Sequence, residues 1–143
     1  MIRFALAATV LVLGFSAVMA QSDPVVERKA TMKAIGGATG LGAKIAKGEE
    51  AFDAAKVQGI FKTYVDSGKK METLFPDSSK NGDTTAGPKI WEDQAGFRAL
   101  QVKFENDAAA AATATTDLAS FRTAFGTVTK NCAACHETYR IKK

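Results

Sequence analysis

The chain has 143 residues, of which 46% are hydrophobic and 24% charged, and its formal net charge is +4. This length suits one domain with a single core. The lysines are scattered along the chain, which is typical of a solvated surface and gives no indication of nucleic-acid binding. Two cysteines and one histidine are too few side chains to complete a four-ligand zinc site.

The N-terminus has the pattern of a secretory signal peptide. Arg3 precedes an apolar run over residues 4–18, and Val18 and Ala20 occupy the −3 and −1 positions of a cleavage site. We expect residues 1–20 to be removed, residues 21–143 to form one domain, and the mature protein to be periplasmic and not membrane-spanning. An uncleaved N-terminal anchor is the alternative, and the polar residues after Ala20 disfavour it.

Helices are predicted throughout the mature chain because no segment alternates apolar and polar residues as a half-buried strand would. The first is expected over about 24–47, with Asp23 as N-cap and Pro24 in its first turn. Its side chains recur at steps of three and four at Val25, Arg28, Met32, Ile35 and Thr39. The second is expected over about 51–73, and its apolar stripe includes Met71 as a core residue.

Residues 74–88 form the only long loop that the sequence predicts. A third helix is expected to start at Pro88 and to continue to the alanine run at 108–112. Thr115, Thr116 or Asp117 caps the fourth helix, whose seam is Leu118, Phe121, Phe125, Val128, Cys132, Cys135, His136 and Tyr139. Short connections favour antiparallel neighbours, so the predicted fold class is an all-α antiparallel four-helix bundle.

The motif Cys132-Ala133-Ala134-Cys135-His136 contains both cysteines and the only histidine. Two thiols one helical turn apart can each add to a haem vinyl group, and the adjacent imidazole can ligate the iron. A disulfide, a thioredoxin-like redox pair and half of a zinc site are the alternatives. Given the export signal, we expect one covalent haem c with His136 as the proximal metal ligand.

The segment 132–140 resembles the C-x-x-C-H-x-x-[Tyr/Phe]-Arg ending of the cytochromes c′, the class II c-type cytochromes. That family carries its haem motif near the C-terminus, as this chain does. Further similar stretches are residues 28–33, 47–55, 74–76 and 88–91. The resemblance covers the mature chain and implies a four-helix bundle with a covalently attached haem.

The resemblance also implies roles for three further residues. In one branch of the family the iron is five-coordinate and high-spin, and in the cytochrome c-556 branch a first-helix methionine is the sixth ligand. Met32 stands at that position, although residue type alone also fits a core methionine. Arg28 is expected to contact a haem propionate, with a surface arginine as the alternative. Arg140 is expected beside the proximal imidazole, with stabilisation of the helix C-terminus as the alternative.

The function expected from these features is a periplasmic monohaem electron carrier with His136 and Met32 as axial ligands. No general base, nucleophile or substrate cleft is visible beside the motif, so no enzyme is predicted. The alternative is a high-spin protein that binds nitric oxide or another small gas, and a structural protein with a bare C-x-x-C is a third hypothesis. Redox proteins are the expected partners, and both a monomer and a homodimer paired through the first two helices stay open.

Overall fold

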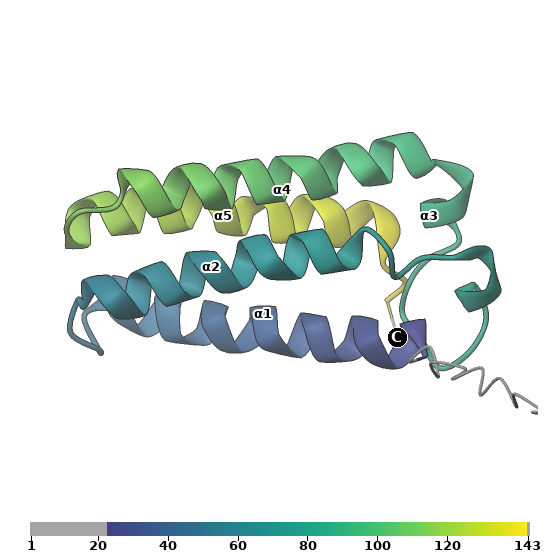
Figure 1. The fold of residues 1–143 in the computed structure, drawn as a ribbon, viewed down its shortest axis with the longest axis horizontal. Helices are drawn as coiled ribbons and strands as arrows, with labels where there is room; N and C mark the ends of the chain where they lie inside the picture. Colours follow the sequence, from purple (N-terminus) through teal and green to yellow (C-terminus); the bar gives the residue numbers. More distant parts are fainter. Residues whose placement is uncertain (1–22, 143) are drawn as a thin grey trace, which may run out of the picture.

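A computed structural model describes residues 23–142, so the predicted signal peptide lies outside the described residues. Four long helices run side by side and form the expected bundle (Figure 1). The long loop, the start of the first helix and the C-terminus lie together at one end of it (Figure 1). In chain order the elements are α1 (Pro24–Lys47), α2 (Ala54–Met71), η1 (Asp77–Ser79), α3 (Lys89–Glu92), α4 (Gln94–Ala114) and α5 (Leu118–Tyr139).

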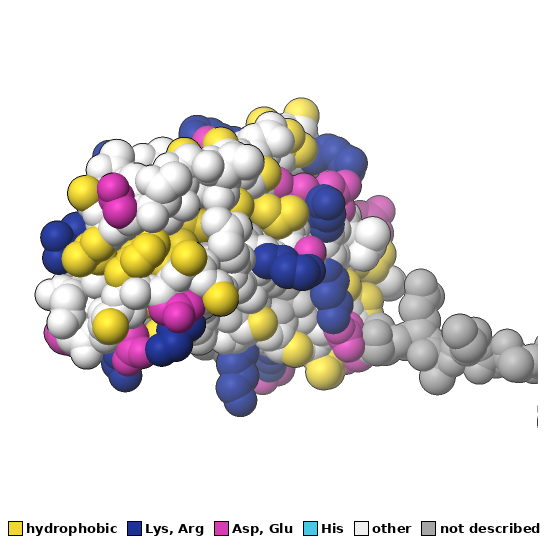
Figure 2. All heavy atoms as spheres, turned by 60° about the vertical axis from the view of Figure 1, so that its left-hand side comes forward, with side chains coloured by type: hydrophobic (Ala, Val, Ile, Leu, Met, Phe, Trp, Pro, Cys, Tyr) yellow, Lys and Arg dark blue, Asp and Glu magenta, His cyan; other side chains and the backbone are white. Residues whose placement is uncertain are grey.

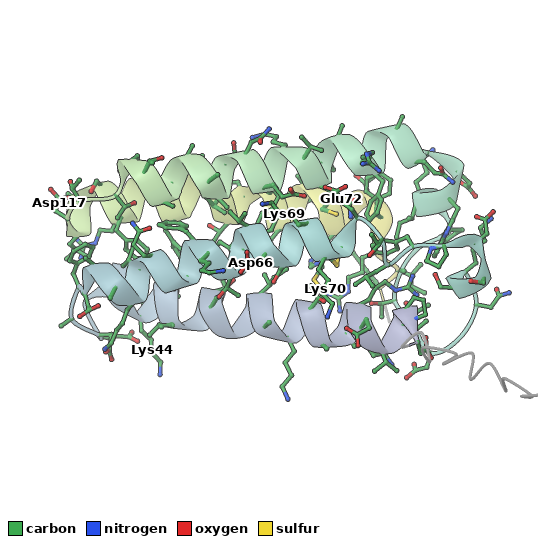
Figure 3. All side chains as sticks on the ribbon, in the orientation of Figure 1. Lys44, Asp66, Lys69, Lys70, Glu72 and Asp117 are labelled. Carbon is green, nitrogen blue, oxygen red and sulfur yellow. The ribbon has the colours of Figure 1, made fainter. Side chains whose placement is uncertain are left out.

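Local capping decides where these helices begin. Asp23 accepts a hydrogen bond from the Val25 amide at 2.8 Å, which confirms the predicted start of α1. Gly48 ends α1 at a φ of 82°, a conformation that favours glycine. Asp117, at the end of the bundle away from the loop, forms a capping box with Ser120 (Figure 3). It is therefore the cap among the three candidates for the last helix.

The prediction of one continuous third helix from Pro88 was wrong. The short α3 ends at Glu92, and Asp93 leaves the helical region with φ −132° and ψ 61°. The Asp93 side chain then accepts a hydrogen bond from the Gly96 amide at 3.1 Å and caps α4. An aspartate that caps a new helix competes with continuation of the preceding one, which explains the break.

The apolar interior has two parts. The larger cluster packs α1, α2, α4 and α5 together around Phe61, Tyr64, Phe121, Phe125 and Val128. A smaller cluster at the loop end contains Ile90, Phe97 and Tyr139, and Cys135 packs against it. The haem motif predicted from the sequence therefore lies next to the smaller cluster, where α5 meets the loop.

On the face drawn in Figure 2, charged side chains of both signs lie among one another. Exposed ion pairs such as Lys29–Asp83 and Arg98–Glu72 join neighbouring elements. This distribution fits a solvated surface. Within residues 23–142, no helix is long and apolar enough to cross a membrane.

Candidate haem-binding site

An open cavity of about 480 Å³ lies between α1, the end of α2, the long loop and the C-terminal half of α5. Its walls are mainly apolar, with Ile35, Met71, Phe75, Ile90 and Phe97 contributing side chains. The structure brings all six residues of the predicted site to this one cavity: Arg28, Met32, Cys132, Cys135, His136 and Arg140. Side chains from opposite ends of the sequence therefore face a common space.

The motif occupies the last turns of α5. Cys132 and Cys135 are three residues apart on the helix and partly buried, and His136 follows directly. Both cysteines are free thiols, so the disulfide alternative is not what this structure contains. No group of three or more His, Cys, Asp and Glu residues suited to a metal ion occurs in the described part of the chain, so the zinc alternative has no support there.

Burial favours the neutral forms of the two thiols and the imidazole of the motif. Desolvation raises the pKa of the Cys135 thiol, and the neighbouring Cys132 adds to this effect. Desolvation also raises the pKa of Cys132. It lowers the pKa of His136, with a further contribution from the positive charge of Arg140. At neutral pH the thiols therefore stay protonated, and the imidazole is in the neutral form that can ligate a metal.

The α1 wall supplies Met32, whose side chain is 36% exposed. Thr39, two turns further along α1, is the hydroxyl on this wall, and its hydrogen bonds are already made. It donates to the Ile35 carbonyl at 2.8 Å, so the Tyr64 hydroxyl, 2.8 Å away, must donate to it. Desolvation raises the pKa of Tyr64 to about 12, which keeps this donor protonated. On this part of the α1 wall, the Met32 thioether is therefore available, whereas the Thr39 hydroxyl is already hydrogen-bonded.

Arg28 is buried, with 5% of its surface exposed, so the surface-arginine alternative is wrong. Its guanidinium donates to the Leu74 carbonyl at 3.1 Å, and to the Ser79 hydroxyl and carbonyl at 3.0 Å each. It also lies 4.8 Å from the ring centre of Phe75. Its Nε is buried without a hydrogen-bond partner, although Arg28 lines the cavity. Desolvation lowers the pKa of Arg28, and Asp23 partly opposes this.

The loop completes the wall through contacts that the sequence did not predict. Ala86 pairs with Arg140 in an isolated antiparallel bridge, where the Gly87 amide donates to the Tyr139 carbonyl at 2.8 Å. Met71, predicted as core, is 7% exposed and also lines the cavity. The helical stripe of α2 could have suggested its direction. The contribution of residues 84–86 had no sequence signal, because it depends on the path of the loop.

A sequence model of the family described as cytochrome c′ matches residues 23–140. The chain belongs to the cytochrome c′ family. A cytochrome c′ from Rhodopseudomonas palustris is 43% identical over 143 residues, covering 99% of this chain and 98% of the relative. A cytochrome c-556 from Agrobacterium fabrum is 42% identical over 118 residues, covering 82% of this chain and 80% of the relative. A solved structure of R. palustris cytochrome c′ has a TM-score of 0.81 at 44% identity, covering 86% of this chain and 99% of that chain.

As a member of this family, the chain is a monohaem c-type cytochrome with one covalently attached haem c. The residues at the cavity suit such a group. Two thiols and an imidazole are grouped at one wall, apolar side chains line the rest, and the buried Nε of Arg28 lacks an acceptor. A haem propionate is a negatively charged carboxylate, which suits it to accept a hydrogen bond from this positively charged guanidinium.

Proposed function

We propose that this cytochrome is an electron carrier whose iron is held by His136 and Met32. The haem supplies a one-electron redox couple when bound. The observation that carries the proposal is that Met32 of α1 and His136 of α5 line the same cavity. Both side chains belong to long helices of the bundle, so they would keep their positions when the charge on the iron changes.

In this proposal, the residues of the site have separate roles in binding the haem. Cys132 and Cys135 form thioethers, which fix the group to the last turns of α5. The neutral imidazole of His136 and the thioether of Met32 would be the two side chains that hold the iron. Thioether ligation favours the reduced iron and so raises the reduction potential.

Arg28 and Arg140 are proposed to interact with the propionates at the edge of the haem. The unpartnered Nε of Arg28 would donate to a propionate while its other nitrogens hold the loop. Arg140 lies on the cavity wall one turn after His136, and its positive charge already lowers the pKa of that imidazole. Both cations would offset the negative charge of the propionates.

The location and partners follow from the same chemistry. We propose that the protein is periplasmic, because c-type haem is attached outside the cytoplasm in bacteria, and that it exchanges electrons with other redox proteins. At Gly37 and Gly40, no atom other than those of the adjacent residues and the backbone of α1 lies within 4 Å of where a side chain would begin. This leaves α1 accessible to a second copy of the chain, so a homodimer is compatible with the proposal.

The first prediction tests the axial ligand. The oxidised holo-protein should be low-spin, with the far-red band that arises from sulfur-to-iron charge transfer. Met32→Ala should make it high-spin and able to bind carbon monoxide readily, because one axial position is then empty. Met71→Ala is the matched control, since it removes a second thioether from the same cavity and should leave the protein low-spin. Absorption spectra of all three proteins, with and without carbon monoxide, make the comparison.

The second candidate is the high-spin gas-binding protein. It is favoured by the exposure of Met32, which lines the cavity but is 36% exposed. A wild-type protein that is already high-spin at neutral pH would refute methionine ligation and support this candidate. Mass spectrometry tests the attachment that both candidates share, because one haem should be found on the peptide that contains Cys132 and Cys135.

A further inference from the structure

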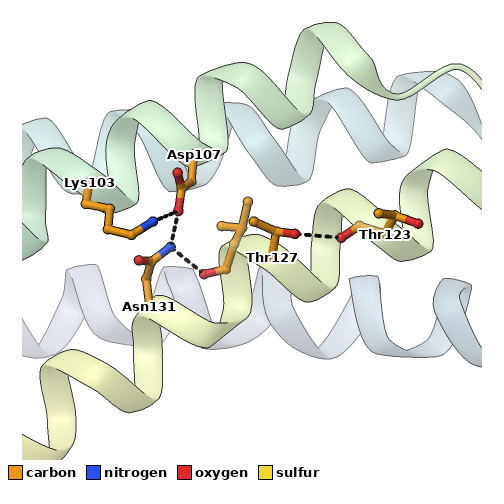
Figure 4. Close-up of polar contacts among 6 residues, drawn as sticks. Lys103, Asp107, Thr123, Thr127 and Asn131 are labelled. Carbon is orange, nitrogen blue, oxygen red and sulfur yellow. Dashed lines mark hydrogen bonds and ion pairs between the residues drawn. The ribbon is translucent and has the colours of Figure 1, made fainter.

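Two side-chain hydrogen bonds join α5 to α4, one on each side of the haem motif. Asn131, directly before Cys132, donates through Nδ2 to an Asp107 carboxylate oxygen at 2.8 Å (Figure 4). Tyr139, three residues after His136, donates its hydroxyl to an Asp93 carboxylate oxygen at 2.8 Å. These are the side-chain hydrogen bonds between the two helices and their caps in the described part of the chain. We call this pair of hydrogen bonds the α4 clamp.

Both donors are buried, so the clamp favours one register of α5 against α4. Asn131 is 7% exposed and Tyr139 is 5% exposed. A buried amide or hydroxyl that loses its acceptor costs about 1–3 kcal/mol. Any sliding or rotation of α5 against α4 would break these hydrogen bonds, whereas apolar contacts tolerate small shifts. A buried asparagine is a known means of fixing the register of packed helices.

Each acceptor is itself held in place. Asp107 also accepts a hydrogen bond from Lys103 at 2.6 Å, one turn earlier on α4 (Figure 4). Asp93 caps α4 through the Gly96 amide. A Cβ at Gly96 would lie 2.6 Å from the Tyr139 hydroxyl, so the absence of a side chain there makes room for this hydrogen bond. The clamp therefore has fixed points on α4.

The two hydrogen bonds lie eight residues apart on α5, roughly 12 Å along the helix axis. Two such points fix both the register and the rotation of the segment between them. That segment contains the motif at residues 132–136, and rotation of the helix would change the direction of the His136 imidazole. We propose that the α4 clamp positions the motif, so that the axial imidazole meets the iron at one angle. This inference rests on the proposed attachment of haem at residues 132–136.

The test uses holo-protein and the hyperfine-shifted haem methyl resonances of the oxidised form, whose spread reports the orientation of the axial ligand. Asn131→Leu and Tyr139→Phe each remove one hydrogen bond and should each shift these resonances. The double variant should shift them most. Asp107→Leu removes the acceptor of Asn131 and should shift the resonances. Asp107→Asn keeps an acceptor oxygen at this position, so its resonances should stay close to those of the wild type.

Two controls separate positioning from stability. Lys103→Met removes one contact that holds Asp107 but keeps both hydrogen bonds of the clamp, so its resonances should shift less than those of Asn131→Leu. Val57→Ala creates a core defect away from the motif, so it should lower the urea midpoint without shifting the resonances. Clamp variants that lose stability as Val57→Ala does, yet keep wild-type resonances, would overturn the inference. Tyr139→Phe, which removes a single oxygen, decides the matter if the double variant does not fold.

Peptide mapping keeps this test distinct from that of the proposed function. If the wild-type peptide with Cys132 and Cys135 carries no haem, the attachment proposal fails. If it carries haem in every variant and the resonances do not move, only the positioning role of the clamp fails.

Discussion

Arg28 ties one helix to the loop that forms a wall of the cavity. Its guanidinium makes three hydrogen bonds to Leu74 and Ser79 while stacked near Phe75. Arg28→Leu would leave buried carbonyl oxygens without donors, so we expect a loss of about 2–4 kcal/mol in the free energy of unfolding. Urea unfolding of the holo-protein measures this loss.

Lys29→Met is the matched control for that variant. Lys29 pairs with Asp83 at the exposed surface, where an ion pair contributes less than about 1 kcal/mol. Arg28→Lys should recover little of the loss, because one ammonium group cannot reproduce the planar array of donors. Equal destabilisation by the changes at 28 and 29 would contradict the role of Arg28.

Glu105 on α4 makes the stability of the folded protein depend on pH. One of its carboxylate oxygens is buried without a partner, and its stem lies where a side chain at Gly68 would be. Burial raises the pKa of Glu105, the charge of Glu72 adds to this, and Lys69 and Arg98 oppose it. Lys69 lies near the end of α2 and Glu72 caps that helix, on the side that neighbours α4 (Figure 3). The folded state therefore holds a proton on Glu105 at pH values where the unfolded chain has released it.

The sign of the effect follows from linkage. The contribution of Glu105 to stability is fully present below its ordinary value of 4.5 and is lost as pH rises through the raised pKa. Glu105→Gln should therefore be more stable than the wild type at neutral pH, and its stability should fall less as the pH rises above about 4.5. Urea midpoints measured across this range test the prediction, and parallel profiles for the two proteins would contradict it.

At the scale of the helices, α1 approaches α5 closely at Gly42. A Cβ at this position would lie 2.3 Å from Cε2 of Phe125, so Gly42→Ala requires the buried Phe125 ring or the helices themselves to move. We expect it to lower the free energy of unfolding by about 1–3 kcal/mol. Gly40→Ala, half a turn away in open space, should instead raise it by about 0.5–1 kcal/mol through helix propensity. Thermal unfolding of both variants distinguishes the effect of packing from that of helix propensity. If both substitutions changed the free energy of unfolding in the same direction, the close approach of α1 to α5 at Gly42 would be refuted.

The helices could be predicted from the sequence wherever a local signal fixes an end. Asp23-Pro24 and Gly48 frame α1, whose predicted range agrees with the structure. The break at Asp93 was missed, because an aspartate within a helical pattern also fits the solvent-facing side of a helix. Hydrogen bonds between helices, such as Asn131 to Asp107, were not predictable either, because they depend on the register of α4 against α5. All six residues of the predicted site line one cavity. The motif itself indicated Cys132, Cys135 and His136, whereas Arg28, Met32 and Arg140 came from the family resemblance, and the role of each in binding haem stays a prediction.

At the scale of the whole molecule, the cavity makes the bundle depend on its prosthetic group. A space of about 480 Å³ with apolar walls removes packing partners from α1, α2 and α5 at once. Loss of one large core side chain costs a few kcal/mol, and loss of a haem removes more contact than that. Cys132→Ala/Cys135→Ala should therefore be molten, with weak near-ultraviolet circular dichroism and binding of a hydrophobic dye. Sharp side-chain resonances in this variant would instead make the haem an accessory to the fold.

The contacts of Arg28 also bear on how this protein can change during evolution. Two of its three acceptors are main-chain carbonyl oxygens, which any amino acid at those positions would supply. The first part of the loop, over residues 74–79, is therefore held by a residue of α1 that lies more than forty positions earlier in the chain. Ser78 is exposed and makes none of these contacts, so we expect substitutions there to leave the backbone in place. The surface beside the cavity can thus acquire new charges, and with them new partners, while the wall behind it keeps its shape.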